Sequence, residues 1–210
     1  MLRRSVLLLA IFLLSFCATA QDKKKLQTGD FLFLDLDCGP LCDAIESVTQ
    51  SYGGQHFSHI GMVYERHDSV FVIEAIGSAV KLTWLPVFLK YSSKPAYHGR
   101  LGSSFRQLIP AAISFSISKL GVPYDDVFLY ANGKYYCSEL IYDAFLSANG
   151  NAPFFSLFPM TYKIPGTKEF DPAWVVYFKK LNQEIPEGKP GCNPGGISLS
   201  DKLEILGIWP

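Results

Sequence analysis

The sequence predicts an α+β domain in which helices pack against a largely antiparallel sheet. Two stretches, FSHIGMVYE (57–65) and SVFVIEAIG (69–77), are rich in β-branched and aromatic residues and are separated by three polar residues, which is typical of a β-hairpin. Other stretches repeat apolar residues at helical spacing between proline and glycine boundaries. With 49% apolar and 18% charged residues, the composition is that of a globular protein.

The chain begins with the features of an export signal. Two arginines precede an apolar run over 6–16, and a small-x-small motif ends at Ala20. This order predicts a signal peptide over 1–20, and the apolar run is short for a membrane span. Lipidation at Cys17 is the alternative, although Phe16 is bulky for a lipoprotein signal. We therefore expect a periplasmic or secreted protein.

After a short lysine-rich linker (21–25), the rest of the chain (26–210) has the length of one domain. Lys plus Arg and Asp plus Glu number 19 each, and no basic stripe suggests nucleic-acid binding. No later segment approaches a membrane-spanning length. Neither a metal nor an organic cofactor is expected.

Local patterns predict the remaining elements. The apolar run 30–36 after Thr28-Gly29 predicts a strand, and the region 80–101 predicts further strand and loop with breaks at its prolines. Proline near the start and glycine near the end, together with one apolar face, predict helices. The predicted helices are 39–54, 110–121 and 137–150, with a loop over 122–135, a late strand over 173–181 and a short helix over 198–206.

Four cysteines remain after signal cleavage, which is too few for a disulfide framework. Cys38 and Cys42 have CxxxC spacing, a weak indication of metal binding because no second Cys or His pair follows at a zinc-finger distance. Both are otherwise interpreted as small, half-buried thiols. If Cys137 stays free, at most one bridge joins two of Cys38, Cys42 and Cys192.

Strand parity brings a histidine and a carboxylate together. Side chains alternate between the two faces of a strand, so His59 and Glu74 share a face when the hairpin turn holds an even number of residues. An odd turn separates them. Glu74 also interrupts an apolar run, and a carboxylate in such a place needs a partner. By the same alternation, His56 points away from His59, whereas His67 in the turn and His98 in a loop are expected to be solvated.

Cys137 is expected at the start of its helix, on the side of the apolar stripe that faces the sheet. Free N–H groups and the positive end of the helix dipole favour a thiolate there. With a histidine nearby, the pKa of such a thiol falls from about 8.5 to well below 7. Each of the three residues alone also has a structural interpretation: Cys137 as a core cysteine, His59 as a histidine in a strand and Glu74 as a buried acid with a partner. Their compatible placement instead favours a nucleophile, its base and the group that orients the base.

Several motifs together resemble the permuted papain-like hydrolases of the YiiX/YaeF type, a branch of the NlpC-type superfamily. They are TGDFLFLD, SHIGMV, VIEA, GVPYD, YYCSEL and the late NPGGISLSDKL, in this order, and they cover about 26–206. In the permuted branch the histidine and the acid precede the cysteine, as in His59, Glu74 and Cys137. The resemblance implies a circularly permuted papain-like fold with a Cys–His–Glu triad.

The resemblance also implies cleavage of amide bonds in peptides or amino-acid conjugates, with cell-wall peptides favoured for exported members. The loop between Ala96 and Tyr124 and the segment 151–170 match nothing in the family pattern, and we expect them to shape the substrate pocket. Two alternatives stay open: a lipid acyltransferase or thioesterase on the same fold, and a non-catalytic binding protein.

Overall fold

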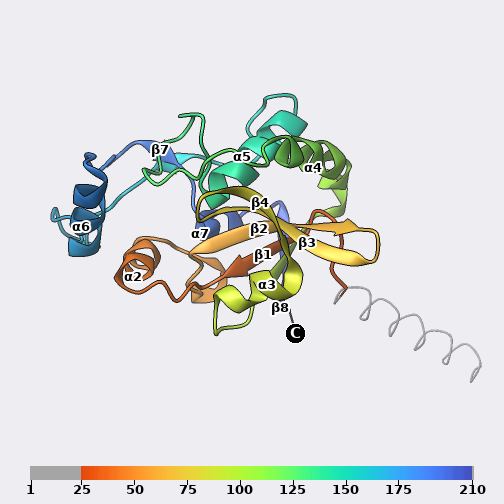
Figure 1. The fold of residues 1–210 in the computed structure, drawn as a ribbon, viewed down its shortest axis with the longest axis horizontal. Helices are drawn as coiled ribbons and strands as arrows, with labels where there is room; N and C mark the ends of the chain where they lie inside the picture. Colours follow the sequence, from red (N-terminus) through yellow and green to blue (C-terminus); the bar gives the residue numbers. More distant parts are fainter. Residues whose placement is uncertain (1–24, 210) are drawn as a thin grey trace, which may run out of the picture.

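The computed structural model describes residues 25–209, and its centre is a six-stranded antiparallel sheet with the strand order β4-β3-β2-β1-β5-β8. Figure 1 shows α4 and α5 on one side of this sheet and α3 on the other, with α2 and α6 beside each other at one end. A two-stranded sheet, β6–β7, lies apart from the main sheet. The strands of the main sheet are β1 (Phe31–Leu34), β2 (His59–Arg66), β3 (Ser69–Ile76), β4 (Ala79–Trp84), β5 (Tyr97–Leu101) and β8 (Leu203–Ile208).

Helices and short elements connect these strands. The α-helices are α2 (Pro40–Ser47), α3 (Leu85–Phe88), α4 (Ile109–Ser118), α5 (Cys137–Ala148), α6 (Pro172–Leu181) and α7 (Pro194–Ser198). The 3-10 helices are η1 (Tyr52–Gly54), η2 (Leu89–Tyr91) and η3 (Ser103–Leu108), and the small sheet pairs β6 (Phe158–Pro159) with β7 (Pro190–Gly191). The predicted α+β class is therefore confirmed.

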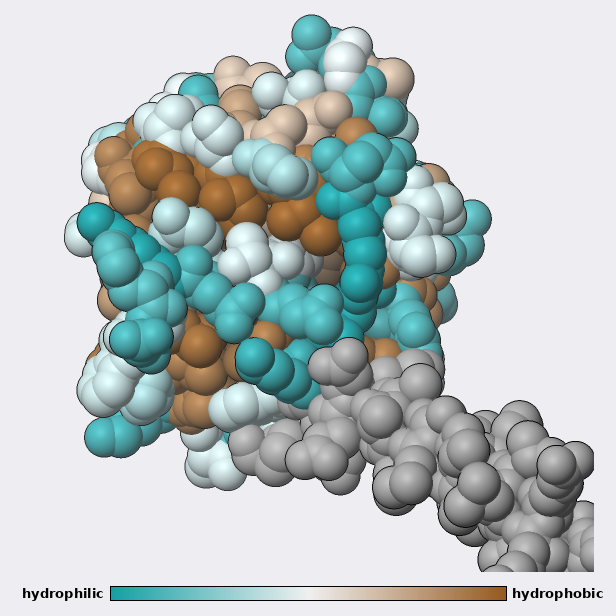
Figure 2. All heavy atoms as spheres, turned by 90° about the vertical axis from the view of Figure 1, so that its right-hand side faces the viewer, coloured by the Kyte–Doolittle hydropathy of each residue, from teal (hydrophilic) through white to brown (hydrophobic). Residues whose placement is uncertain are grey.

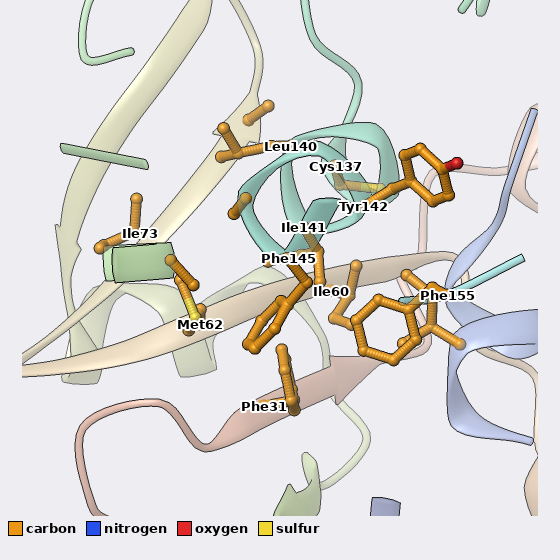
Figure 3. Close-up of a cluster of buried hydrophobic side chains, with 14 of the residues drawn as sticks. Phe31, Ile60, Met62, Ile73, Cys137, Leu140, Ile141, Tyr142, Phe145 and Phe155 are labelled. Carbon is orange, nitrogen blue, oxygen red and sulfur yellow. The ribbon is translucent and has the colours of Figure 1, made fainter. Parts of the chain in front are cut away.

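Two apolar clusters hold the sheet between its helices. On one face, Phe31, Ile60 and Met62 pack with the inward stripe of α5, and Figure 3 shows these side chains meeting Ile141 and Phe145. On the other face, the alternate residues pack against α3. The strands thus carry apolar residues on both faces, which is why the hairpin sequences are nearly continuous apolar runs.

Two late elements differ from their predictions. The segment 173–181, predicted as a strand, is helix α6: the Asp171 side chain caps it by accepting a hydrogen bond from the Ala173 N–H at 2.8 Å. Trp174 and Phe178, four residues apart, are buried on one side of the helix, whereas Val175 and Val176, whose β-branched side chains suggested a strand, are exposed. Tertiary burial of one helical face outweighs the weak β-propensity of two valines.

The predicted helix 198–206 was also wrong. Residues 194–198 form α7, which begins after Asn193, and the chain then turns into strand β8 at Leu203. The Asn193 side chain accepts a hydrogen bond from the Gly196 N–H at 2.7 Å and so starts the helix earlier than the apolar pattern indicated. Strand β8 is stabilised by pairing with β5, a contact between residues about a hundred positions apart.

The predicted helix 39–54 ends early, at Ser47. Cys42 in its first turn forms a disulfide with Cys38, which precedes the helix, and this bond replaces both the metal and the free-thiol interpretations of these residues. The predicted helices 110–121 and 137–150 are confirmed as α4 and α5, with ends that differ by up to three residues. The predicted signal peptide (1–20), Cys17 and most of the linker lie outside the described residues.

Among the described helices, none has the length and apolar character that a membrane crossing requires. Figure 2, turned toward the side of α4 and the β2–β3 turn, shows an apolar band bordered by hydrophilic side chains.

Candidate active site

Cys137 is the first residue of α5, and its side chain is 7% exposed. Tyr136 before it is extended, so the chain enters the helix at Cys137. Leu140, Ile141 and Phe145 anchor the helix in the core, and Figure 3 shows Cys137 on the same helix. The predicted position of the thiol, at the N-terminus of a buried helix, is confirmed.

His59 and Glu74 form a buried pair on the β2–β3 hairpin. Arg66 pairs with Ser69, so the turn holds two residues, and the even count puts both side chains on one face as predicted. The His59 Nε2 and Glu74 Oε2 atoms are 2.6 Å apart, and the two side chains are 2% and 0% exposed. Gly61, two residues after His59, lies so close to the Val72 side chain that a larger residue would displace it.

The pair is held by groups that sequence reasoning did not identify. The other oxygen of Glu74, Oε1, accepts hydrogen bonds from the Thr83 hydroxyl on β4 and from the Tyr91 hydroxyl at 3.3 Å. Alternation along β4 could have placed Thr83 on the face of Glu74, because Thr83 is paired with Val72 in the ladder. Tyr91 carries no such signal, since it lies in the 3-10 helix η2.

His59 interacts with both other predicted residues. Burial lowers the pKa of its imidazole, but hydrogen bonds to Cys137 and Glu74 and the charges of those groups raise it from 6.5 to about 9. Because Nε2 binds Glu74, Nδ1 is the ring nitrogen left for Cys137. The structure therefore brings together Cys137, His59 and Glu74, and it favours a charged imidazole between the thiol and the carboxylate.

The other histidines lie outside this group. His67 is exposed in the hairpin turn as expected, and His56 is 63% exposed with Glu46 at 3.9 Å. The expectation for His98 was wrong: it is buried on β5, and its Nε2 lies 2.8 Å from the carboxylate of Asp30. Arg100 donates two hydrogen bonds to the same carboxylate, at 2.7 Å each.

This second buried cluster holds two neighbouring strands together. Asp30 precedes β1, whereas His98 and Arg100 belong to β5. Burial raises the pKa of Asp30, but the hydrogen bonds from Arg100 and His98 outweigh it and keep the pKa below its usual value. Asp30, the acid of the TGD motif, thus has a structural role, because it binds His98 and Arg100.

The two remaining thiols are unlike. Cys137 and Cys192 are both free, buried and beside the same cavity. Burial raises the pKa of Cys192 far above its ordinary value, so its nucleophilic thiolate is suppressed. The backbone of Cys192 is fixed to the start of α5, because its N–H donates to the Tyr136 hydroxyl at 3.2 Å and its carbonyl accepts from Ser138 at 3.0 Å.

Glu139, two residues after Cys137, is fully buried in α5. Burial raises its pKa from 4.5 to about 8, although hydrogen bonds from the backbones of Ala131 and Tyr136 lower it. One carboxylate oxygen accepts from the Ala131 N–H at 2.9 Å, and this bond ties the preceding loop to the helix. The carboxyl group is therefore largely uncharged at neutral pH.

A cavity of about 160 Å³ opens beside Cys137. The segment 158–162 supplies part of its wall, in agreement with the prediction that 151–170 shapes a pocket. The prediction for the loop between Ala96 and Tyr124 was wrong, because only Tyr124 at its end lines the cavity and the rest builds β5, η3 and α4. Within residues 25–209, no three His, Cys, Asp or Glu side chains gather as metal ligands would.

A comparison with known protein families shows the family of this chain. The profile of the permuted papain-like amidases of the YaeF/YiiX type, the C92 family, matches residues 25–204. The chain belongs to the C92 family. Its antiparallel sheet with flanking helices is therefore a permuted papain-like fold, in which the hairpin with the histidine precedes the helix with the cysteine.

Two known proteins are similar to this chain. The YiiX protein of Escherichia coli (strain K12), described as uncharacterized, is 32% identical over 127 residues, and the alignment spans 59% of this chain and 59% of that protein. The crystal structure of YiiX from Escherichia coli O157:H7, titled a metalloprotein, shares the fold with a TM-score of 0.69. The two chains are 24% identical, and the match covers 88% of this chain and 98% of that one.

Proposed function

We propose that this C92-family protein is a thiol amidohydrolase with Cys137 as nucleophile, His59 as base and Glu74 as the group that orients the base. The observation that carries the proposal is the buried chain of contacts from Glu74 through His59 to Cys137. A thiol needs a partner that takes its proton, and a base needs a partner that fixes its orientation. The substrates are peptides or amino-acid conjugates.

The reaction begins from a thiolate–imidazolium pair. The Cys137 thiolate attacks the carbonyl carbon of the amide, and the carbonyl oxygen becomes an oxyanion. His59 donates its proton to the departing nitrogen, so the C–N bond breaks, the amine leaves and a thioester remains on Cys137. His59 then takes a proton from water, the hydroxide attacks the thioester, and the acid product leaves as the thiolate re-forms.

The start of α5 also suits the charge that develops on the substrate. Because the first N–H groups of a helix have no partner within the helix, the Cys137 N–H is available to the oxyanion. The positive end of the helix dipole favours both the thiolate and the oxyanion. Glu74 keeps the imidazole in one tautomer through the 2.6 Å contact at Nε2.

We further propose that the protein is exported, by cleavage after Ala20. The arginines and the apolar run before Ala20 support this location. The Cys38–Cys42 disulfide gives independent support, because such bonds persist mainly in oxidising compartments. The lipoprotein alternative at Cys17 would keep the domain in the same compartment.

The test is turnover of peptide amides and of acyl-lipid esters by the wild type and by Cys137→Ser, with products identified by mass spectrometry. We expect amide cleavage that is lost in the variant. Preferential ester cleavage would indicate the lipid enzyme instead, and turnover of neither class by protein whose Cys137 resists iodoacetamide near pH 6 would indicate a binding protein.

A further inference from the structure

The cavity beside Cys137 continues as a groove along the domain. The residues that line both the cavity and the adjoining hollow are Val48, Phe158 and Asn193. The residues that line both this hollow and a third one are Phe158, Gly196 and Leu199. Because neighbouring hollows share their walls, they form one groove that runs from Cys137 past Asn193 to Leu199. A substrate that reacts at Cys137 can therefore extend along this groove.

The two walls of the groove are fixed to each other. One wall is the segment 48–52 that follows α2, and the other is α7 with the residues on either side of it. Gly195 in α7 lies so close to the Gln50 carbonyl that a side chain there would collide with it. The Ser198 hydroxyl accepts a hydrogen bond from the Tyr52 N–H at 2.9 Å. The groove is therefore formed before a substrate arrives, which lowers the cost of binding.

Asn193 lies where the cavity meets the groove, and its side chain is held in one orientation. Its Oδ1 atom accepts a hydrogen bond from the Gly196 N–H at 2.7 Å. A backbone N–H can bond only to the oxygen of an amide group, so the nitrogen Nδ2 points away from this contact. The preceding residue, Cys192, is hydrogen-bonded to both chain neighbours of Cys137. Asn193 is thus mounted rigidly beside the thiol.

The Nδ2 atom of Asn193 is an accessible donor without a partner. Within residues 25–209 it makes no hydrogen bond, and it is not sealed from solvent, since 9% of the residue stays exposed. By contrast, the hydroxyls of Thr49, Ser138 and Thr161, which also line the cavity, each donate to an oxygen of the protein. Nδ2 can therefore bind an acceptor on a ligand without breaking a hydrogen bond within the protein.

The surroundings of Asn193 suit a neutral acceptor. Within residues 25–209, the other residues that line the groove beside it are uncharged; they are Val48, Gln50, Phe158, Gly196 and Leu199. A carboxylate in this place would have no cation beside it to replace its lost hydration. A peptide carbonyl is a neutral acceptor and recurs along an extended chain, so it matches both the donor and the groove.

We propose that Asn193 is a substrate-binding residue, whose Nδ2 donates a hydrogen bond to a backbone carbonyl of a chain that extends from the scissile amide along this groove. The inference rests on the proposed function, in which Cys137 is the nucleophile. It narrows the substrate to a peptide chain of several residues, as opposed to the conjugate of a single amino acid or a hydrocarbon chain.

The test measures alkylation of Cys137, in which the thiolate displaces chloride, and peptide mapping by mass spectrometry assigns the label. Chloroacetyl-trialanine amide extends on the amine side of the reactive group, and its parent is chloroacetamide. Acetyl-trialanine chloromethyl ketone extends on the acyl side, and its parent is chloroacetone. The gain is the rate constant of the long reagent divided by that of its parent. In the wild type, at least one series should gain about 10- to 50-fold from the added hydrogen bond and apolar contacts.

Two variants remove the donor but keep the cap of α7. Asn193→Asp retains an acceptor for the Gly196 N–H and replaces Nδ2 by an oxygen, so the gain should fall about 10-fold. Asn193→Ser is a neutral cap without the amide nitrogen, so the gain should fall about 2- to 10-fold. Since the gain is a ratio, any change in the reactivity of the thiol itself cancels. Asp171→Asn, at the cap of α6 outside the groove, is the control and should leave the gain unchanged.

Three results would overturn the inference. The first is a gain near one for both series in the wild type, and the second is a wild-type gain in both Asn193 variants. The third is a gain for N-octyl chloroacetamide that falls as much in the variants as the peptide gain does, because Asn193 would then shape the groove without binding a carbonyl. The proposed function fails in a different way: Cys137 would react with unsubstituted chloroacetamide no faster than Cys192.

Discussion

Replacing Glu74 by Gln keeps the shape of the side chain and one acceptor oxygen but removes its charge. In the wild type, Glu74 is fully buried and its Oε2 lies 2.6 Å from His59 Nε2. The change converts a charge-assisted hydrogen bond into a neutral one, which costs about 1.4 kcal/mol or more. That free energy corresponds to about one pH unit in the pKa of His59 and to about a tenfold change in rate.

We therefore expect kcat/KM for a peptide amide to fall about 10- to 100-fold, because orientation of the imidazole is lost in addition. The pH profile gives a second readout. The imidazolium of His59 is lost as the pH rises through about 9, so the alkaline limb of the wild type should lie there. In Glu74→Gln the limb should move about one pH unit lower.

The measurement is kcat/KM between pH 5.5 and 10 for the wild type, Glu74→Gln and the control Glu65→Gln, which removes an exposed carboxylate from the same hairpin. The control should retain the wild-type profile. If Glu74→Gln also retains both the rate and the alkaline limb, Glu74 has no part in the reaction and a Cys–His dyad remains.

Three further outcomes follow from the contacts around the site. Thr83→Val removes a donor to Glu74 but keeps its charge, so kcat/KM should fall about 2- to 10-fold while the alkaline limb stays near 9. Glu139→Gln should become more stable relative to the wild type as pH rises from 4.5 through about 8, because the folded protein binds a proton there that the unfolded chain releases; thermal melts at pH 5 and 8.5 measure this difference. Asp30→Ala should lower the free energy of unfolding by about 3 kcal/mol in urea titrations, because the buried side chains of His98 and Arg100 lose a shared carboxylate.

Local periodicity was sufficient to predict where His59, Glu74 and Cys137 lie in the fold. Alternation along two strands and an even turn placed His59 with Glu74, and the apolar stripe of 137–150 placed Cys137 at the start of a buried helix. These features depend on residues that are neighbours in the sequence or lie across one short turn. The contact between the helix and the hairpin was a hypothesis from the residue types, and in the structure His59 interacts with Cys137.

Long-range contacts account for most of what the sequence left undetermined. Helix α6 was mistaken for a strand because its two valines are β-branched, whereas its stability comes from burying Trp174 and Phe178 against α2. His98 appeared to be a loop residue because the pairing of β5 with β1 and β8 leaves no local pattern. The equal numbers of acidic and basic residues also did not indicate the buried Asp30–Arg100 ion pair, because such a pair adds no net charge.

The assembly of the cavity has a consequence for the newly made chain. Cys137, His59 and Glu74 all belong to the first 140 residues, whereas much of the cavity wall comes from 158–194. Synthesis delivers the N-terminal part first, so we expect Cys137 and its partners to come together before these cavity walls are complete. A truncated or incompletely delivered chain would then be an indiscriminate nucleophile, and discrimination would be the last property acquired during maturation.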